Sequence, residues 1–188
     1  MSNNQKFGGL TEDDIKQNRR EFFSLDYQKA KFKNNDEEYP GVRGTFRGVG
    51  SNEFEWEGQK IRKFTVFLEN NGTLMQVETG FNTWTTYQIM NLLLNCNGSL
   101  KNSIVTLALV KTPEKKTTLF MQVNGNYMKY KFKFADMKFP EGKDAREKHV
   151  AKVIAKWYDE LIKLYEYKTE PQAVEEFVDE VAADDIPF

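Results

Sequence analysis

Between residues 41 and 134, apolar side chains alternate with polar ones in six short stretches, and this period of two constrains the fold more than any other feature. Such a period is that of a β-strand with one buried face. The alternation is interrupted over residues 85–95, where Ile89, Leu92 and Leu93 have helical spacing instead. The strands predicted in this way span residues 42–49, 60–69, 73–81, 104–111, 117–123 and 127–134.

The order of these elements, three strands, one helix and then two or three strands, narrows the architecture. It is the order of the OB-fold, a five-stranded and partly open barrel. Asn-Gly pairs at residues 71–72 and 124–125 predict tight hairpin turns between neighbouring strands. We therefore expect a mainly β protein, with an OB-fold barrel of five to six strands and one inter-strand helix over residues 39–139. A small β-barrel of another topology is the alternative.

The segments on either side of this barrel differ from it in composition. Residues 1–38 are polar and are expected to form an arm, in which Thr11 could cap a short helix. Residues 140–168 carry an apolar stripe at helical spacing, which predicts an additional C-terminal helix packed on the barrel. Residues 169–188 are acidic, and we expect them to form a disordered tail. The stripe consists of Val150, Val153, Ile154, Trp157, Leu161 and Leu164.

Charge is divided unevenly along the chain, although its net value is only −1. Residues 169–188 hold seven acidic side chains and no basic one. The remaining 168 residues hold 27 basic and 21 acidic side chains, a net charge of +6. A basic body with an acidic tail is typical of a polyanion binder whose own tail can compete with the polyanion. Ordinary surface charge is the alternative explanation.

The last five residues point to a family. Phe188 carries the terminal carboxylate and follows two acids, an Ile and a Pro, so it is poorly suited to a core. This ending resembles the C-terminal tip of bacterial single-stranded DNA-binding proteins, and the resemblance covers about the last tenth of the chain. It implies DNA replication, recombination or repair enzymes as partners. The residues expected to bind them are Asp184, Asp185, Ile186, Pro187 and Phe188.

That family's usual N-terminal strand sequence is not found here, and the chain looks like a divergent member of the kind that a phage could encode. This departure leaves the oligomeric state open between a monomer and a homo-oligomer.

Binding a single strand without reading its sequence requires cations along the phosphates and flat rings against the bases. The predicted strands and their loops offer both kinds of side chain. For Trp56 a role in packing or in hairpin pairing is the alternative, since three glutamates lie beside it in the sequence. The residues expected to bind single-stranded DNA are Arg43, Arg47, Phe54, Trp56, Lys60, Arg62, Lys63, Phe67, Lys111, Lys115, Lys116, Tyr127, Lys129, Lys131 and Lys133.

The sequence argues against catalysis. Its only histidine, His149, has no partner at metal-ligand spacing, and no phosphate-binding Gly-Lys-Ser/Thr loop is present. We expect no enzyme activity and no cofactor, and Cys96 as a buried structural thiol. A single cysteine and the lack of a long apolar segment favour a cytoplasmic protein without a membrane partner. The alternatives to a DNA-coating protein are an OB-fold adaptor and an annealing or nuclease subunit of a recombination system.

Overall fold

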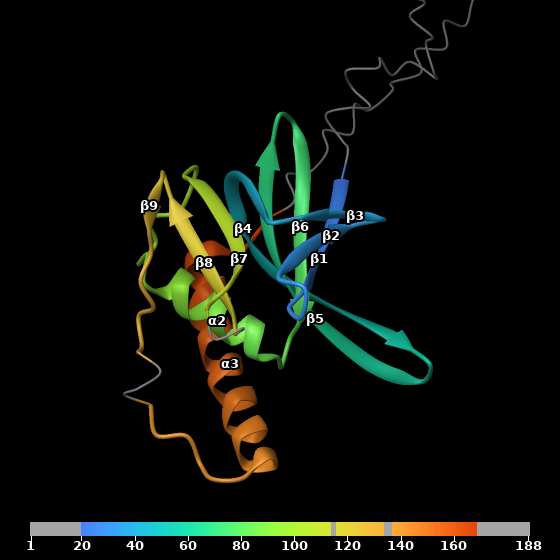
Figure 1. Ribbon diagram of the computed structural model, residues 1–188, viewed down its shortest axis with the longest axis vertical. Coiled ribbons are helices and arrows are strands. Elements are labelled where there is room, and N and C mark those ends of the chain that lie inside the picture. Colours follow the sequence, from blue (N-terminus) through green and yellow to red (C-terminus); the bar gives the residue numbers. More distant parts are fainter. Residues whose placement is uncertain (1–19, 114–115, 134–136, 169–188) are drawn as a thin grey trace, which may run out of the picture.

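The computed structural model describes residues 20–113, 116–133 and 137–168, which form one mixed, open β-sheet and two helices (Figure 1). The protein is therefore mainly β, as predicted. The sheet has nine strands in the order β3-β2-β1-β6-β5-β4-β7-β8-β9, against the five or six expected. The strands are β1 (Arg20–Asp26), β2 (Lys31–Asn34), β3 (Glu37–Tyr39), β4 (Gly41–Trp56), β5 (Gln59–Asn70), β6 (Thr73–Gly80), β7 (Ile104–Lys111), β8 (Thr117–Val123) and β9 (Asn126–Tyr127).

The central strands follow the predicted order. Strands β4, β5 and β6 form an antiparallel meander, helix α2 (Trp84–Leu94) follows, and β7 then pairs with β4 on one side and β8 on the other. Both Asn-Gly turns have the predicted chemistry, because Asn71, Gly72, Asn124 and Gly125 all have positive φ. The meander and the helix of the sequence prediction are thus confirmed.

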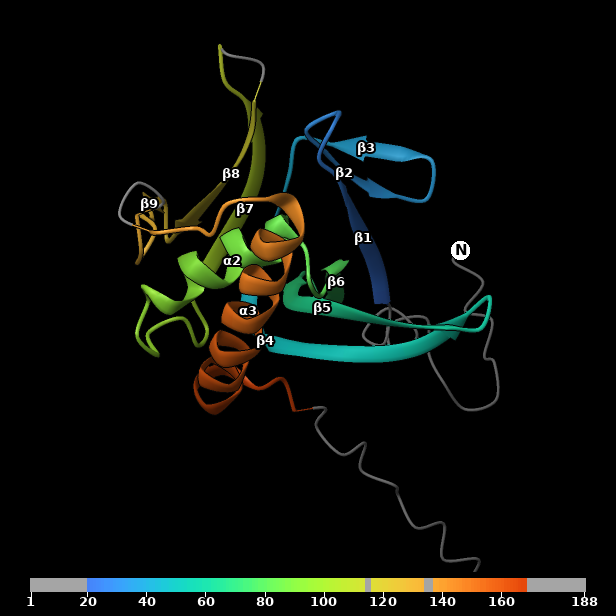
Figure 2. The same ribbon diagram turned by 90° about the horizontal axis from the view of Figure 1, so that it is seen from below.

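Strands β4 and β5 are longer than predicted and run on together as a hairpin. The alternation was read as ending at residue 49, but pairing continues to Trp56 opposite Gln59. Glu57 and Gly58 close the hairpin with φ of 51° and 73°, the combination that a two-residue turn of right-handed twist requires. Figures 1 and 2 show this hairpin projecting from the body of the molecule.

The N-terminal strands were not predicted. Residues 20–39, assigned largely to a polar arm, form β1, β2 and β3, and β1 pairs in parallel with β6. Phe23 and Phe32 are 5% and 0% exposed and belong to the core. Each ring lies among charged residues, so the alternation is too short to identify a strand from the sequence. Burial of the two rings is what makes these segments strands. The helix expected to begin at Thr11 lies outside the described residues.

The last predicted strand, residues 127–134, is wrong over residues 128–133, and residue 134 lies outside the described residues. Strand β9 ends at Tyr127, and the chain then runs along α2. Asn91 of α2, which is fully buried, holds this segment with two hydrogen bonds: its Nδ2 donates to the Phe132 carbonyl at 2.9 Å, and its Oδ1 accepts from the Phe132 N–H at 2.8 Å. A buried amide therefore replaces a neighbouring strand as the partner of this backbone.

Helix α3 (Lys143–Tyr165) packs against α2 and closes the core from one side of the sheet (Figure 2). Its buried residues include four of the predicted stripe, Val150, Ile154, Trp157 and Leu161. Of the other two, Val153 is half-buried and Leu164 is 49% exposed. Among the described helices, none is long and apolar enough to cross a membrane.

The sheet curls but does not close by strand pairing. Tyr27, in the turn between β1 and β2, donates from its hydroxyl to the Thr117 carbonyl at 2.7 Å, and the Thr117 hydroxyl donates to the Tyr27 carbonyl at 2.7 Å. These two bonds bring the N-terminal strands against the start of β8.

Candidate nucleic-acid interface

The β4–β5 hairpin separates its rings from most of its charges. Successive side chains of a strand point to opposite faces, so the facing pair Phe54 and Ile61 shares one face with Trp56. Phe54 is 37% exposed and Trp56 61% exposed. The opposite face carries the pairs Glu53–Arg62 and Glu55–Lys60. We call the side with Phe54, Trp56, Ile61 and Lys63 the ring face of the hairpin.

The cations of the hairpin do not act as one group. Lys63 Nζ lies 5.3 Å from the centre of the Phe54 ring and 2.7 Å from Glu78 Oε2. Arg62 instead lies on the other face, with its guanidinium carbon 3.8 Å from the centre of the Phe81 ring and bonds to the Ser51 hydroxyl. Lys60, also on that face, is 3.7 Å from Glu53. Only Lys63 of these three accompanies the rings.

Phe67 lies on the outer face of the sheet, in line with the ring face, and is covered by the protein itself. Tyr167 stacks on it with ring centres 4.1 Å apart and ring planes inclined by 18°. The C-terminal segment reaches this position by crossing β4, where the Tyr167 N–H donates to the Val49 carbonyl at 2.9 Å. The ring that was expected to meet a base therefore meets a tyrosine.

The crossing depends on a bend in β4. The pairing of β4 with β5 shifts register between Phe46 and Gly48, and Gly48 has a φ of 148°. A Cβ on Gly48 would lie 2.6 Å from the Tyr165 carbonyl oxygen. Glycine is thus required both by the backbone conformation and by the close approach of the C-terminal segment.

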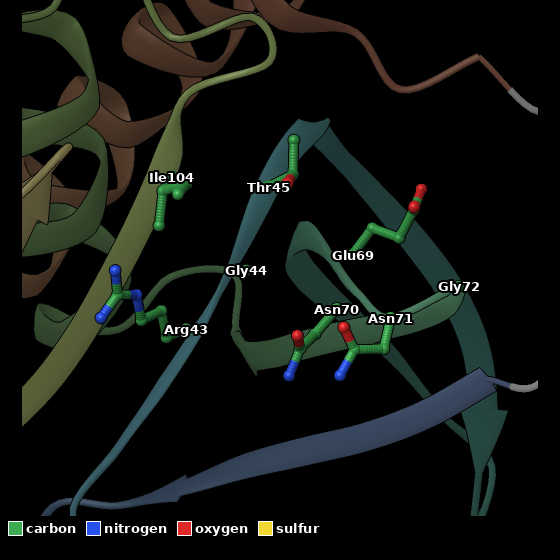
Figure 3. Close-up of a pocket in the computed structure, with 8 residues that line it drawn as sticks. All are labelled: Arg43, Gly44, Thr45, Glu69, Asn70, Asn71, Gly72 and Ile104. Carbon is green, nitrogen blue, oxygen red and sulfur yellow. The ribbon is translucent and has the colours of Figure 1, made fainter.

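Arg43 and Arg47 lie on the outer face of β4 but in different environments. Arg47 Nε donates to Glu69 Oε2 at 2.8 Å, and one of its terminal nitrogens donates to Asn102. Arg43 is exposed and has no carboxylate partner within the described part of the chain. It lines a cleft of about 320 Å³ (Figure 3).

The remaining predicted residues lie elsewhere on the sheet. Lys111 ends β7 and Lys116 precedes β8, whereas Lys115 falls outside the described residues. Tyr127 of β9 is 71% exposed, with its ring edge-on to Phe120. Figures 1 and 2 place β9 and the hairpin at opposite sides of the molecule. Those members of the predicted set that the structure describes therefore do not form one patch.

The three lysines of residues 128–133 follow β9 in the chain. Lys129, Lys131 and Lys133 are exposed, but they stand on the irregular segment beside α2 and do not alternate with rings along a strand. Phe132, between two of them, stacks on Trp157 with ring centres 5.2 Å apart. The partner-binding residues Asp184, Asp185, Ile186, Pro187 and Phe188 lie outside the described residues.

The sequence prediction missed two residues of the outer face, Phe22 and Tyr167. Phe22 of β1 is 54% exposed and sits opposite Gln76 of β6, which in turn sits opposite Phe67. A row of side chains thus crosses three strands from Phe22 to Phe67. The alternation of Phe23 with its neighbours could have placed Phe22 outward, whereas nothing local in sequence pairs Tyr167 with Phe67.

Burial raises the pKa of the Cys96 thiol to about 11, so the thiol stays protonated at neutral pH and is a poor nucleophile. This agrees with the buried structural role predicted for it. Residues 20–113, 116–133 and 137–168 contain no group of three or more His, Cys, Asp or Glu that could hold a metal ion.

Comparison of the chain with protein-family models, with curated proteins and with solved structures finds no match in any of the three.

Proposed function

We propose that this protein binds single-stranded DNA without sequence preference, coats it and protects it in the cytoplasm. The observation that carries the proposal is the ring face of the hairpin, where exposed Phe54 and Trp56 stand beside Lys63. Exposed rings are costly on a free surface, and each ring that stacks on a base contributes about 1–3 kcal/mol. Stacking of this kind does not depend on the identity of the base, since every base offers a flat face.

An OB-fold is the architecture that we propose for the central strands. Strands β4, β5 and β6, then α2, β7 and β8, follow its order. In this fold the surface of the second and third strands and the loop between the first two bind oligonucleotides. Those elements correspond to β5, β6 and the β4–β5 hairpin, the region where the ring face and Phe67 lie. Strand β1 beside β6 is an addition to the five-stranded pattern.

The tail is the second half of the proposal. Residues 184–188 would recruit replication, recombination or repair enzymes, with Phe188 in an apolar pocket of the partner and its carboxylate beside a basic residue. This assignment rests on the resemblance of the last five residues and on the seven acids of the tail. It makes the protein a binding and recruiting factor, not an enzyme.

The test is a fluorescence anisotropy titration of the full chain with labelled oligo-dT. We expect binding that weakens steeply with salt. Trp56→Leu, which keeps an apolar side chain but loses the ring, should weaken binding about tenfold or more, and Trp56→Phe should restore part of the loss. Leu164→Ala, which also shortens an exposed apolar residue but on α3, is the control and should bind like the wild type.

An adaptor that binds a protein through the same hairpin is the second candidate. It is favoured by Glu53 and Glu55 on the opposite face of the hairpin and by Glu57 in its turn, because their negative charge would repel a phosphate. Failure of the full chain and of a chain lacking residues 169–188 to bind oligo-dT at low salt would reject DNA binding in favour of the adaptor.

A further inference from the structure

A cleft of about 320 Å³ opens on the outer face of the sheet, between β4, the turn joining β5 to β6, and the start of β7 (Figure 3). Its size is at the lower end of the range for small-molecule sites. The cleft is lined by Arg43, Gly44, Thr45, Glu69, Asn70, Asn71, Gly72 and Ile104.

Most of the polar groups in this cleft are unused by the fold. Arg43, Asn70 and Asn71 make no side-chain hydrogen bond or ion pair to other described residues. All three side chains are planar, and together they offer a guanidinium fork and two amide NH₂ groups. Figure 3 shows Arg43 on one side of the cleft, next to β7, and Asn70 and Asn71 on the other side, at the turn that joins β5 to β6.

The one carboxylate at the cleft is neutralised from outside it. Glu69 Oε2 accepts from Arg47 Nε at 2.8 Å, and Arg47 is not among the lining residues. Since the charges of Glu69 and Arg47 cancel, the positive charge of Arg43 at the cleft is uncompensated. A cation is disfavoured there.

The residues that line the cleft also argue against a nucleic-acid base or an apolar molecule as its ligand. No ring is present on which a base could stack, and Ile104 is the single large apolar side chain among the eight. An apolar ligand would leave the guanidinium and the amides desolvated without partners. An oxyanion instead accepts hydrogen bonds from all of these donors, and a guanidinium fork matches phosphate geometry.

We propose that this cleft holds one phosphodiester group of the bound DNA strand, with Arg43 as the ionic contact and the amides of Asn70 and Asn71 as neutral donors. The inference rests on the proposed function. Glu69 and Phe67 are two residues apart on β5 and share the outer face, about 7 Å from each other along the strand. The bound DNA strand would therefore pass from the rings of the hairpin over β5 and into the cleft.

Two substitutions on opposite sides of the cleft should change affinity in opposite directions. Arg43→Ala should weaken oligo-dT binding about tenfold and make the slope of log affinity against log salt shallower by about 0.7, the value for one phosphate on a single strand. Glu69→Gln, which keeps the size of the side chain but removes its charge, should tighten binding at low salt. Misfolding cannot produce such a gain, so the pair separates local chemistry from loss of structure.

Lys152→Ala is the matched control, since it removes one exposed positive charge from α3, away from the cleft. Asn71→Gly is a further probe, because Asn71 has a φ of 49° that glycine adopts without strain, and only the amide is lost. It should weaken binding less than Arg43→Ala and leave the salt slope unchanged.

The outcomes distinguish the proposed role of the cleft from the proposed binding of single-stranded DNA. If the wild type binds oligo-dT while Arg43→Ala and Glu69→Gln match Lys152→Ala in affinity and slope, the cleft assignment is overturned and DNA binding stands. If the wild type does not bind oligo-dT, both the role of the cleft and DNA binding by the protein are rejected. Side-chain amide signals of Asn70 and Asn71 that move in NMR spectra with inorganic phosphate, but not with oligo-dT, would assign the cleft to free phosphate and overturn its role in DNA binding.

Discussion

Asn91 is the residue on which the segment after β9 most depends. Its side chain is completely buried and satisfies both the N–H and the C=O of Phe132. No alternation or helical spacing reveals this role, because the two residues are 41 positions apart and a polar residue in α2 looks like an exposed one. The sequence alone therefore predicted a strand where an amide holds an irregular segment.

Replacing Asn91 with alanine should lower the free energy of unfolding by about 2 kcal/mol, because two backbone groups of Phe132 lose their partner in a partly buried place. Urea denaturation followed by tryptophan fluorescence measures this change. Asn95→Ala is the control. Asn95 makes one exposed bond to the Lys129 carbonyl, at 3.1 Å, and its loss should cost well under 1 kcal/mol. Equal effects of the two substitutions would contradict the role given to Asn91.

At the scale of single elements, the bend of β4 links the sheet to the C-terminal segment. Gly48→Ala should displace residues 165–167, since the added Cβ would lie 2.6 Å from the Tyr165 oxygen and 2.8 Å from Tyr167 backbone atoms. The positive φ adds strain of about 1–3 kcal/mol. Faster hydrogen exchange of the Tyr167 N–H and a lower melting temperature are the expected results.

Gly50→Ala provides the comparison for that experiment. A Cβ on Gly50 meets only the Phe67 ring, at 3.1 Å and 3.8 Å, and the ring can shift by a few tenths of an ångström. Exchange at Tyr167 should then stay close to that of the wild type. Exchange that rises equally in both variants would show that the crossing does not depend on Gly48.

The elements that could be predicted from sequence are those whose signal is local. Strands β4 to β8 and helices α2 and α3 have regular periods and turn residues within a few positions of each other. Strands β1 and β2 bury one ring each among many charges, so their pairing with other strands decides their structure. The same limit applies to the candidate site. Arg43 was found from alternation and Trp56 from the loop expected between the first two strands, whereas the cover on Phe67 comes from a residue 100 positions away.

At the scale of the whole molecule, the acidic tail is expected to compete with DNA for the basic body. Tyr167 lies on Phe67 on the outer face of the sheet, so the chain enters residues 169–188 beside the surface proposed to bind DNA. Deleting these residues changes the net charge from −1 to +6. Oligo-dT binding should then tighten several-fold at low salt, where screening is weak, and much less near 0.2 M salt.

Removing Phe188 alone separates this effect from recruitment. The seven acids of the tail remain, so DNA affinity should equal that of the full chain at every salt concentration, while binding to a partner enzyme should be lost. If deletion of residues 169–188 leaves the low-salt affinity unchanged, the tail does not reach the DNA-binding surface. If loss of Phe188 tightens DNA binding as much as the full deletion does, the competition is by the terminal ring and not by charge. The two deletions, each titrated at low and high salt, therefore assign the inhibition either to the acids or to the ring.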